Sequence, residues 1–489
     1  MKPWQFYGRN DQLDSLQTIF SRRRWFFAKV SGRRRIGKTT LIQRALRAAD
    51  SGQSVLYMQV PDSEPMGVIS AVCDALETFE VPADQFPRPQ NLAQFAKLIE
   101  ALACAGYILV LDEFQYFNRK GYEEFCSLLQ AVVDRLSSRA EEVPGGLVVL
   151  GSVQTEMMAL LEDRRAPLFN RVTDSIDLTH LDIASLCEML ADHADATPER
   201  LLFLWNLFEG VPKFYRDCYE QGVLAEDRTT LLRRIFFESS SPLRTEAENW
   251  FLHELRGRYD VVLKYVARNP GKMHGDLVQA IRLASDDPEA QIAGYLKMLI
   301  ERLQLIERRL PVFAKPEARR SRYYIADNFL RSWLAALANP VSAIAFRPVD
   351  QLVREADQRL EIVEGTALER LAGQLYQERS GKGVGDFPLT QRIQGYWDKA
   401  GTELDLVAVN DMEEIIRFGS CKRSSSKLIS DINNFKGHVD RFLQALPKYR
   451  DWKVQYAGIA PTLDREQRAI LEHHDVIPQD LNDLLSGLR

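Results

Sequence analysis

The first 180 residues alternate short apolar runs with longer amphipathic stretches. The runs are rich in β-branched and aromatic residues and indicate strands at 26–30, 55–60, 107–111 and 147–150. Between them, stretches such as 39–49 and 124–136 place apolar residues at helical spacing. Alternation of strands and helices predicts a parallel sheet covered by helices on both faces.

From residue 182 to residue 338 the apolar periodicity is almost wholly helical. Two short strands, expected at 305–313 and 322–325, follow a helix expected at 287–303, a pattern typical of a winged helix-turn-helix. Residues 337–350 hold two prolines and little periodicity, which indicates a linker.

The rest of the chain returns to mixed α/β character. A long helix is predicted at 352–378 and a shorter one at 428–443. Strands are predicted at 403–409, 414–422 and 453–459.

Composition limits the class of protein. A length of 489 residues suggests about three domains, and a net charge of −5 excludes a wholly basic nucleic-acid coat. No apolar run is long enough for a membrane helix, and the first residues contain no secretory signal. The six cysteines form no CxxC pair, which indicates reduced thiols, so we expect a cytoplasmic protein without a membrane partner. The seven histidines show no spacing typical of metal ligands.

The first strong motif runs from Gly32 to Thr39 and reads GRRRIGKT, which matches G-x-x-x-x-G-K-[ST]. It follows an apolar strand and opens a helix, so its glycines allow backbone N–H groups to face phosphate oxygens. Lys38 is expected to bridge the β- and γ-phosphates, and Thr39 to hold Mg²⁺. ATP and Mg²⁺ are therefore the expected cofactors, with Gly32, Gly37 and Thr40 completing the nucleotide-binding set.

A second motif lies downstream, where four apolar residues lead into Asp112 and Glu113. Open α/β sheets bind ligands at the carboxyl ends of their strands, which is where these acids are expected. Asp112 is predicted to support Mg²⁺, and Glu113 to orient or deprotonate the attacking water.

These motifs resemble the prokaryotic STAND-type branch of the AAA+ P-loop ATPases. The resemblance implies that Gly8 and Arg9, in the stretch FYGR, approach the adenine. It also implies that Ser152 reads the γ-phosphate, that Arg171 in APLFNR is an arginine finger, and that Pro212 in EGVPK packs near the base. Assembly of a homo-oligomer through the ATPase domain is a further expectation.

The residues alone leave other interpretations open. Ser152 is also consistent with an ordinary residue at a strand end, and Arg171 with a surface ion-pair partner acting in no catalytic role. Pro212 is also consistent with a simple helix break.

A basic segment lies on the expected recognition helix and wing. Residues 301–322 contain seven Lys or Arg against three acids. Cations there are expected to contact DNA phosphates without reading sequence, with Arg319, Arg320 and Arg322 as candidates. The alternative is a solvated hairpin or a wing that docks on protein.

The last 140 residues resemble the PD-(D/E)XK nuclease-like domain. The resemblance implies a site formed by Glu369, Glu403, Asp405 and Lys422, which in active members binds Mg²⁺. The acid expected two residues before Lys422 is instead Ser420. A neutral hydroxyl is a poor replacement for a carboxylate, so we expect an inactive or severely weakened nuclease.

The expected fold class is therefore α/β, with a P-loop NTPase parallel sheet, a helical lid, a winged helix-turn-helix and a restriction-endonuclease-like domain. The expected boundaries are 1–180 for the ATPase core, 181–256 for the lid, 257–336 for the winged helix, 337–350 for the linker and 351–489 for the nuclease-like domain. The leading hypothesis is an ATP-hydrolysing switch that binds ATP or ADP and acts on DNA. The alternatives are an ATP-gated endonuclease and an ATP-dependent scaffold that does not hydrolyse.

Overall fold

The computed structural model describes residues 2–48, 54–152, 154–247, 258–285, 289–315 and 320–488. It divides into two compact units. The N-terminal unit comprises Gly8–Leu181 with Val211–Lys213, and the C-terminal unit comprises Met1–Tyr7, Asp182–Gly210 and Phe214–Arg489.

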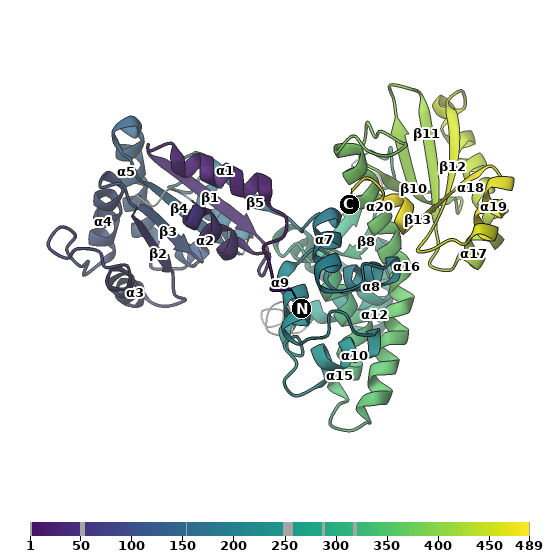
Figure 1. Cartoon of the computed structure of the whole chain (residues 1–489), viewed down its shortest axis with the longest axis horizontal. Helices are drawn as coiled ribbons and strands as arrows, with labels where there is room; N and C mark the ends of the chain where they lie inside the picture. The colour runs from purple at the N-terminus through teal and green to yellow at the C-terminus, as the bar shows by residue number, and fades with distance from the viewer. Residues whose placement is uncertain are drawn as a thin grey trace. The chain divides into compact units, whose positions relative to one another are not determined.

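The N-terminal unit is built on a five-stranded parallel sheet in the order β2-β3-β4-β1-β5 (Figure 1). Its strands are β1 Phe26–Gly32, β2 Val55–Gln59, β3 Ile108–Asp112, β4 Gly146–Gly151 and β5 Asp174–Leu178. Its helices are α1 Asn10–Ser21, α2 Lys38–Ala48, α3 Pro65–Thr78, α4 Leu92–Cys104, α5 Glu123–Ser137 and α6 Gln154–Leu161. The four predicted strands are confirmed. β5 was not predicted, because it is an edge strand with exposed polar positions and little apolar pattern.

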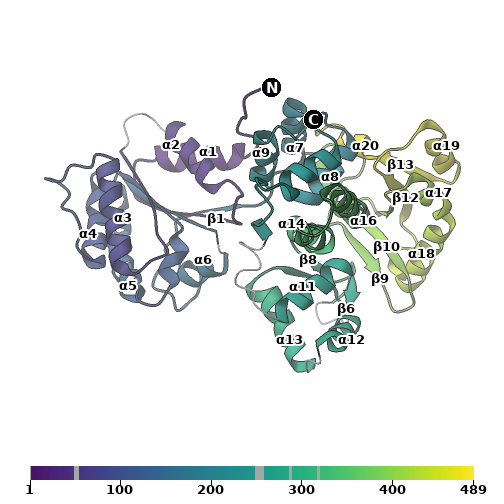
Figure 2. The same cartoon turned by 90° about the horizontal axis from the view of Figure 1, so that it is seen from below.

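Helices cover both faces of this sheet (Figures 1 and 2). Phe27, Leu109 and Val149 belong to one core cluster with side chains of α3, α4 and α5. Residues of opposite parity, such as Val110 and Val148, are equally buried. Burial on both faces explains why these strands read as continuous apolar runs rather than as alternating ones.

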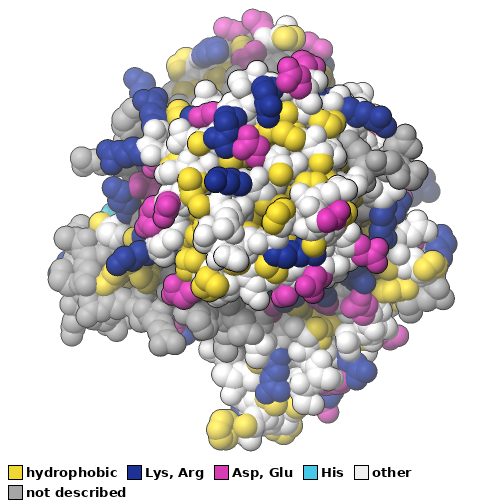
Figure 3. Space-filling view, turned by 90° about the vertical axis from the view of Figure 1, so that its left-hand side faces the viewer, with side chains coloured by type: hydrophobic (Ala, Val, Ile, Leu, Met, Phe, Trp, Pro, Cys, Tyr) yellow, Lys and Arg dark blue, Asp and Glu magenta, His cyan; other side chains and the backbone are white. Residues whose placement is uncertain are grey.

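The surface near α3, α4 and α5 carries charges of both signs. Figure 3 shows Lys and Arg side chains interspersed there with acidic and hydrophobic ones. Mixed signs weaken any long-range field from this face, so it is a poor candidate for attracting a polyanion.

The C-terminal unit begins with a helical part and a small sheet in the order β6-β8-β7. The helices are α7 Ile183–His193, α8 Pro198–Phe208, α9 Pro212–Glu220, α10 Arg228–Leu232, α11 Arg258–Arg268, α12 His274–Ser285, α13 Glu289–Lys297, α14 Asn328–Ser332 and α15 Ala338–Ser342. The strands are β6 Lys272–Met273, β7 Ile306–Arg309 and β8 Arg322–Ile325. β7 and β8 pair antiparallel, and this hairpin (residues 306–315 and 320–325) is here called the wing. β7 ends at Arg309, short of the predicted strand end at 313. The predicted linker at 337–350 contains α15 and the start of the next helix.

A second, mixed sheet follows in the order β13-β12-β11-β10-β9. Its strands are β9 Gln394–Trp397, β10 Glu403–Asn410, β11 Ile415–Cys421, β12 Lys453–Ala460 and β13 Val476–Asp480. Its helices are α16 Val349–Gly381, α17 Ser425–Ser430, α18 Ile432–Ala445, α19 Arg465–His473 and α20 Leu481–Leu485. β9, β10 and β11 are antiparallel, whereas β11, β12 and β13 run parallel. The three predicted strands are confirmed, and the predicted helix at 428–443 divides into α17 and α18.

A register shift in β10 positions the acids of this sheet. Pairing with β9 changes register between Leu404 and Val407, and both of these residues contribute to the core on the α18 side. The extra residue of a bulge re-aims neighbouring side chains. Asp405 lies within this irregular stretch.

The architecture is therefore mixed α/β, with a parallel five-stranded sheet in one unit and a separate sheet in the other. Across the part of the chain that the structure describes, no helix combines the length and apolarity that crossing a membrane requires.

Candidate functional site

The phosphate-loop motif forms the connection between β1 and α2. β1 ends at Gly32 and α2 begins at Lys38. A Cβ at Gly32 would lie 2.5 Å from the carbonyl oxygen of Leu178, so the close approach of β5 requires glycine there. Gly37 has a φ of +97°, which also favours glycine. The loop therefore has a backbone that other residues adopt only with strain.

Lys38 is buried beneath this loop, with 7% of its surface exposed. Its Nζ donates to the carbonyl oxygens of Gly32 at 2.9 Å and Arg33 at 3.1 Å. Desolvation lowers the pKa of Lys38 to about 8, although the charges of Glu113 and Asp112 oppose the shift. A bound phosphate would add negative charge and favour the ammonium form.

Thr39 and Asp112 meet across the loop. The Thr39 hydroxyl donates to Oδ2 of Asp112 at 2.8 Å, and the Tyr57 hydroxyl donates to the same oxygen at 2.5 Å. The other carboxylate oxygen accepts from the backbone N–H of Glu113 at 2.8 Å. Burial raises the pKa of Tyr57, and its bond to Asp112 adds to the shift. Asp112 is therefore held in one orientation beside Thr39.

The donor set fits Mg²⁺, which prefers hard oxygen ligands and usually takes one or two from protein. Thr39 supplies a hydroxyl and Asp112 a carboxylate within hydrogen-bond distance of each other. Among the described residues no group of three or more His, Cys, Asp or Glu side chains is placed to hold a metal. An ion here would therefore need further oxygens from phosphate and water.

Glu113 lies at the carboxyl end of β3 in a left-handed conformation, with a φ of 58°. Its Oε2 accepts a hydrogen bond from the Ser152 hydroxyl at 3.0 Å and another from the Gln115 amide. Gln115 is 1% exposed and also donates to the Ser152 hydroxyl at 3.3 Å. The structure thus brings Glu113 and Ser152 together, and it adds Gln115 to them.

Arg171 has a different environment. Its Nε and Nη2 donate to the two carboxylate oxygens of Asp134 on α5, at 2.7 and 3.0 Å. Nη1 donates to the carbonyl oxygen of Phe169 at 2.9 Å. In this conformation the guanidinium forms a surface ion pair. The sequence left this role open beside that of an arginine finger.

The remaining nucleotide-binding candidates lie around the loop of the N-terminal unit. Gly8 and Arg9 both have positive φ values, 63° and 66°, and Arg9 precedes α1 and donates to the carbonyl oxygen of Thr179. A Cβ at Gly37 would meet Cγ of Pro212 at 3.7 Å, so Pro212 lies beside the phosphate loop. Thr40 is exposed in the first turn of α2.

Tyr57 and Gln115 were missed from the sequence. Each has a weak signal: Tyr57 lies in the strand predicted at 55–60, and Gln115 follows Glu113 by two residues. Neither signal distinguishes a site residue from an ordinary core residue without the sheet order.

A second polar cluster lies in the C-terminal unit, where α16 meets β10 and β11. Asp405 Oδ2 accepts from the backbone N–H of Cys421 at 2.8 Å and lies 3.2 Å from Nζ of Lys422. Desolvation and the charge of Asp405 raise the pKa of Glu369 to about 8. Ser420 is buried, with 4% of its surface exposed.

The wing packs against this cluster. Nη1 of Arg322 lies 2.6 Å from Oε1 of Glu403, and its guanidinium lies 4.6 Å from the ring centroid of Trp397. The Trp397 indole donates to the carbonyl oxygen of Arg320 at 2.7 Å. Arg319, the third DNA candidate, lies outside the described residues.

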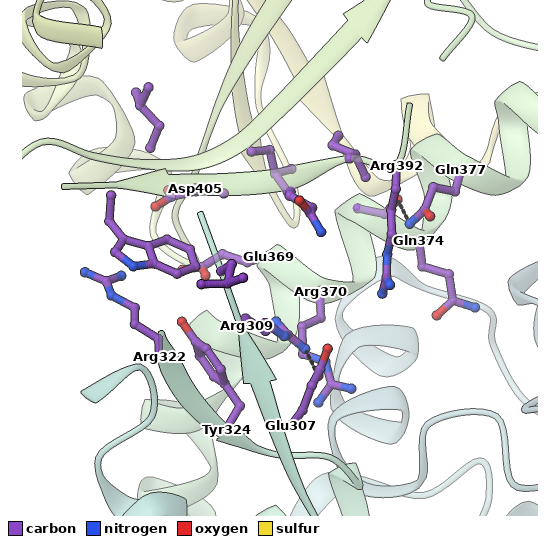
Figure 4. Close-up of a pocket in the computed structure, with 18 of the residues that line it drawn as sticks. Glu307, Arg309, Arg322, Tyr324, Glu369, Arg370, Gln374, Gln377, Arg392 and Asp405 are labelled. Atoms are coloured by element: carbon purple, nitrogen blue, oxygen red, sulfur yellow. Dashed lines mark hydrogen bonds and ion pairs between the residues drawn. The ribbon is translucent and has the colours of Figure 1, made fainter. Parts of the chain in front are cut away.

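A crevice of about 590 Å³ lies where the wing, α16 and β10 meet. Figure 4 shows Glu369 and Asp405 facing it from the α16 and β10 side, and Arg322, Tyr324 and Arg309 from the wing. Five arginines line it in total: Arg308, Arg309, Arg322, Arg370 and Arg392. Five acids lie among them: Glu209, Glu307, Glu369, Glu403 and Asp405.

Comparison with known proteins identifies the class of the N-terminal part. Residues 6–214 match a family described as an ATPase domain predominantly from Archaea. The phosphate loop, Asp112 and Glu113 all lie within this match. Residues 6–214 are therefore similar to ATPase domains of this archaeal type, which supports ATP binding by this part of the chain.

Similarity to a further protein extends along nearly the whole chain. An uncharacterized protein of Methanocaldococcus jannaschii, MJECL04, is 23% identical over 483 residues, covering 98% of this chain and 99% of that protein. Among solved structures, the Walker-type ATPase paby2304 of Pyrococcus abyssi is 17% identical with a TM-score of 0.51, over 67% of this chain and 96% of its own. The ORC2 protein of Aeropyrum pernix, in ADPNP–ADP complexes, is 17% identical with a TM-score of 0.46, over 74% and 96%. The structural likeness to the Pyrococcus protein concerns the fold.

Proposed function

We propose that the protein is a Mg²⁺-dependent, ATP-hydrolysing switch of the STAND/AAA+ kind. The observation that carries the proposal is the pair of contacts at the carboxyl end of β3, where Asp112 holds Thr39 and Glu113 is held by Ser152. In this proposal Asp112 serves a metal and Glu113 a water. A protein that only binds nucleotide has no need of the second acid.

The residues of the site have distinct roles in this proposal. Lys38 exchanges its loop carbonyls for β- and γ-phosphate oxygens. Thr39 and Asp112 hold Mg²⁺, which when bound neutralises developing charge on the phosphates. Glu113 orients the attacking water and accepts its proton, and Ser152 positions the Glu113 carboxylate. Gly8, Arg9 and Pro212 lie near the adenine.

The test is phosphate release measured with and without duplex DNA, with the DNA strands then analysed on a denaturing gel. We expect steady ATP turnover, a change in its rate when DNA is added, and intact strands. Nucleotide binding without turnover would support the scaffold alternative instead. Turnover indifferent to any DNA would overturn the association with DNA.

For the C-terminal sheet we propose a PD-(D/E)XK-like domain that has lost its nuclease function. Two observations support this proposal. A helix is followed by the antiparallel strands β9, β10 and β11 and by the parallel strand β12. Asp405 and Lys422 lie near the ends of β10 and β11. Duplex contacts by Arg319, Arg320 and Arg322 are the accompanying proposal for the wing.

The residues of that cluster do not fit a catalytic metal. Asp405 is paired with Lys422, and Glu403 with Arg322. The raised pKa of Glu369 favours its uncharged form at neutral pH. Ser420 contributes no charge. A hard divalent cation prefers several charged oxygens, so we derive no cleavage step at this cluster.

Replacing Ser420 with glutamate is expected to raise the affinity of this cluster for Mn²⁺ by at least tenfold, about 1.4 kcal/mol. The new carboxylate would lie beside Asp405 and offer a second charged ligand. Isothermal titration with Mn²⁺ in the absence of nucleotide, in a Lys38→Ala background, measures the change.

Ser420→Gln is the matched control, because it adds nearly the same volume to this buried position without charge. Equal Mn²⁺ affinity in both variants would contradict the assignment of Ser420 to the lost ligand position. Mg²⁺-dependent strand cleavage by the unmodified protein, lost in Asp405→Ala, would contradict the loss of nuclease function.

A further inference from the structure

The wing contacts the C-terminal sheet through polar and apolar groups together. The backbone N–H of Val312 donates to the carbonyl oxygen of Gly395 at 2.9 Å. The Val312 side chain, 5% exposed, belongs to the hydrophobic core that lies between β10, β11 and α18. Phe313 stacks on Tyr449, with ring centroids 4.9 Å apart. These contacts join the wing to the C-terminal sheet that follows it in sequence.

Arg322 is the charged centre of this interface. Its side chain is 17% exposed and lies between the Glu403 carboxylate and the face of Trp397. The guanidinium therefore neutralises Glu403, and a phosphate, which also offers several acceptor oxygens, could take the place of that carboxylate.

Each acid of the cluster is matched by a basic group of this chain or made neutral. Glu403 faces Arg322, and Asp405 faces Lys422. Glu307, on the wing itself, pairs with Arg309, which also lies 4.6 Å from the Tyr324 ring centroid. Two of the wing's arginines that would attract a polyanion are thus engaged with carboxylates.

We infer that the start of β10, with Glu403 and Asp405, is a docking site for the wing, and that DNA competes with Glu403 for Arg322. This inference rests on the DNA association proposed above. In the docked state the wing arginine takes the place of a cation beside Glu403. The wing docked on the sheet and the wing bound to DNA are then alternative states of the same hairpin.

The direction in which one substitution changes the affinity for duplex DNA distinguishes this arrangement from a nuclease site. Glu403→Gln removes the competing charge and frees Arg322, so affinity for duplex DNA rises. Because the pair is partly solvent-exposed, we expect a two- to tenfold increase, on the order of one surface ion pair. The logarithmic salt dependence of binding becomes steeper by about 0.9, the value for one added phosphate contact. If Glu403 served only to bind a metal, Glu403→Gln would change neither the DNA affinity nor its salt dependence in metal-free buffer.

Docking itself is measured without DNA. Hydrogen exchange of the full-length protein, followed by mass spectrometry, reports the Val312 amide through a peptide covering 310–313. Glu403→Gln and Arg322→Glu are expected to accelerate its exchange. The double variant Arg322→Glu/Glu403→Arg restores the pair with reversed charges and is expected to return exchange toward the wild-type rate.

Glu413→Gln is the matched control, since Glu413 is an exposed acid in the turn between β10 and β11 of the same domain. Exchange at Val312 that is unchanged in Glu403→Gln and Arg322→Glu would overturn the docking inference. Faster exchange without a rise in DNA affinity would overturn the competition. If exchange accelerates and no variant binds DNA at all, docking stands and the proposed DNA association fails.

Discussion

The Glu113→Gln protein is expected to bind ATP as the wild type does but to hydrolyse it about 10²–10⁴-fold more slowly. The amide keeps the shape of the side chain and can still accept from the Ser152 hydroxyl, whose oxygen lies 3.0 Å from the carboxylate. It cannot accept the proton of the attacking water. Phosphate release under saturating Mg²⁺-ATP measures the rate, and a fluorescent ATP analogue measures binding.

Lys38→Ala provides the complementary outcome. Without the buried ammonium, the β- and γ-phosphates lose their cation, and binding itself is expected to fail. Arg47→Ala, which removes an exposed cation from the far end of α2, is the control and should change neither quantity. Wild-type turnover by Glu113→Gln would mean that Glu113 is not the base.

The second large effect concerns Arg171. If it acts as an arginine finger, Arg171→Ala is expected to reduce turnover by about 10³–10⁵-fold, since a finger acts only on the charge of the transition state. Such a role requires the guanidinium to leave Asp134, to which it now donates at 2.7 and 3.0 Å. The ion pair is exposed, with side-chain exposures of 25% and 51%, so its loss costs at most about 1 kcal/mol.

Two comparisons separate a catalytic role from a structural one. Asp134→Asn weakens the same pair but leaves the arginine, so turnover should be kept or increased if Arg171 is the finger. Equal small effects of Arg171→Ala and Asp134→Asn on thermal stability, with turnover unchanged, would assign the arginine to the ion pair alone. Recovery of activity on mixing Arg171→Ala with Lys38→Ala subunits would show that the finger acts between subunits.

Most of the nucleotide site could be predicted because its chemistry depends on residues that are adjacent in sequence. The loop from Gly32 to Thr39 is one continuous turn between a strand and a helix, and Asp112 with Glu113 ends one strand. Tyr57 and Gln115 could not be predicted, because their relevance depends on the order β2-β3-β4. Only that order brings Tyr57 to Asp112 and Ser152 to Glu113.

The edge strands show the same limit for the fold. β1, β3 and β4 are buried on both faces and therefore read as apolar runs, whereas the edge strands β5, β9 and β13 have weaker patterns. The edge strand β2 was predicted because it is nearly all apolar in sequence. Partial exposure removes the apolar signal on which the prediction depends.

By itself the sequence determined the alternation of strands and helices and the phosphate loop with its acids. Each of these is a local property, since periodicity and adjacent side chains are set by backbone geometry. The tertiary structure alone decided that Arg322 faces Glu403 and that Arg171 faces Asp134. A charged side chain interacts with whichever opposite charge the fold brings within a few ångströms. Glu403 lies 81 residues from Arg322 in sequence, and Asp134 lies 37 residues from Arg171.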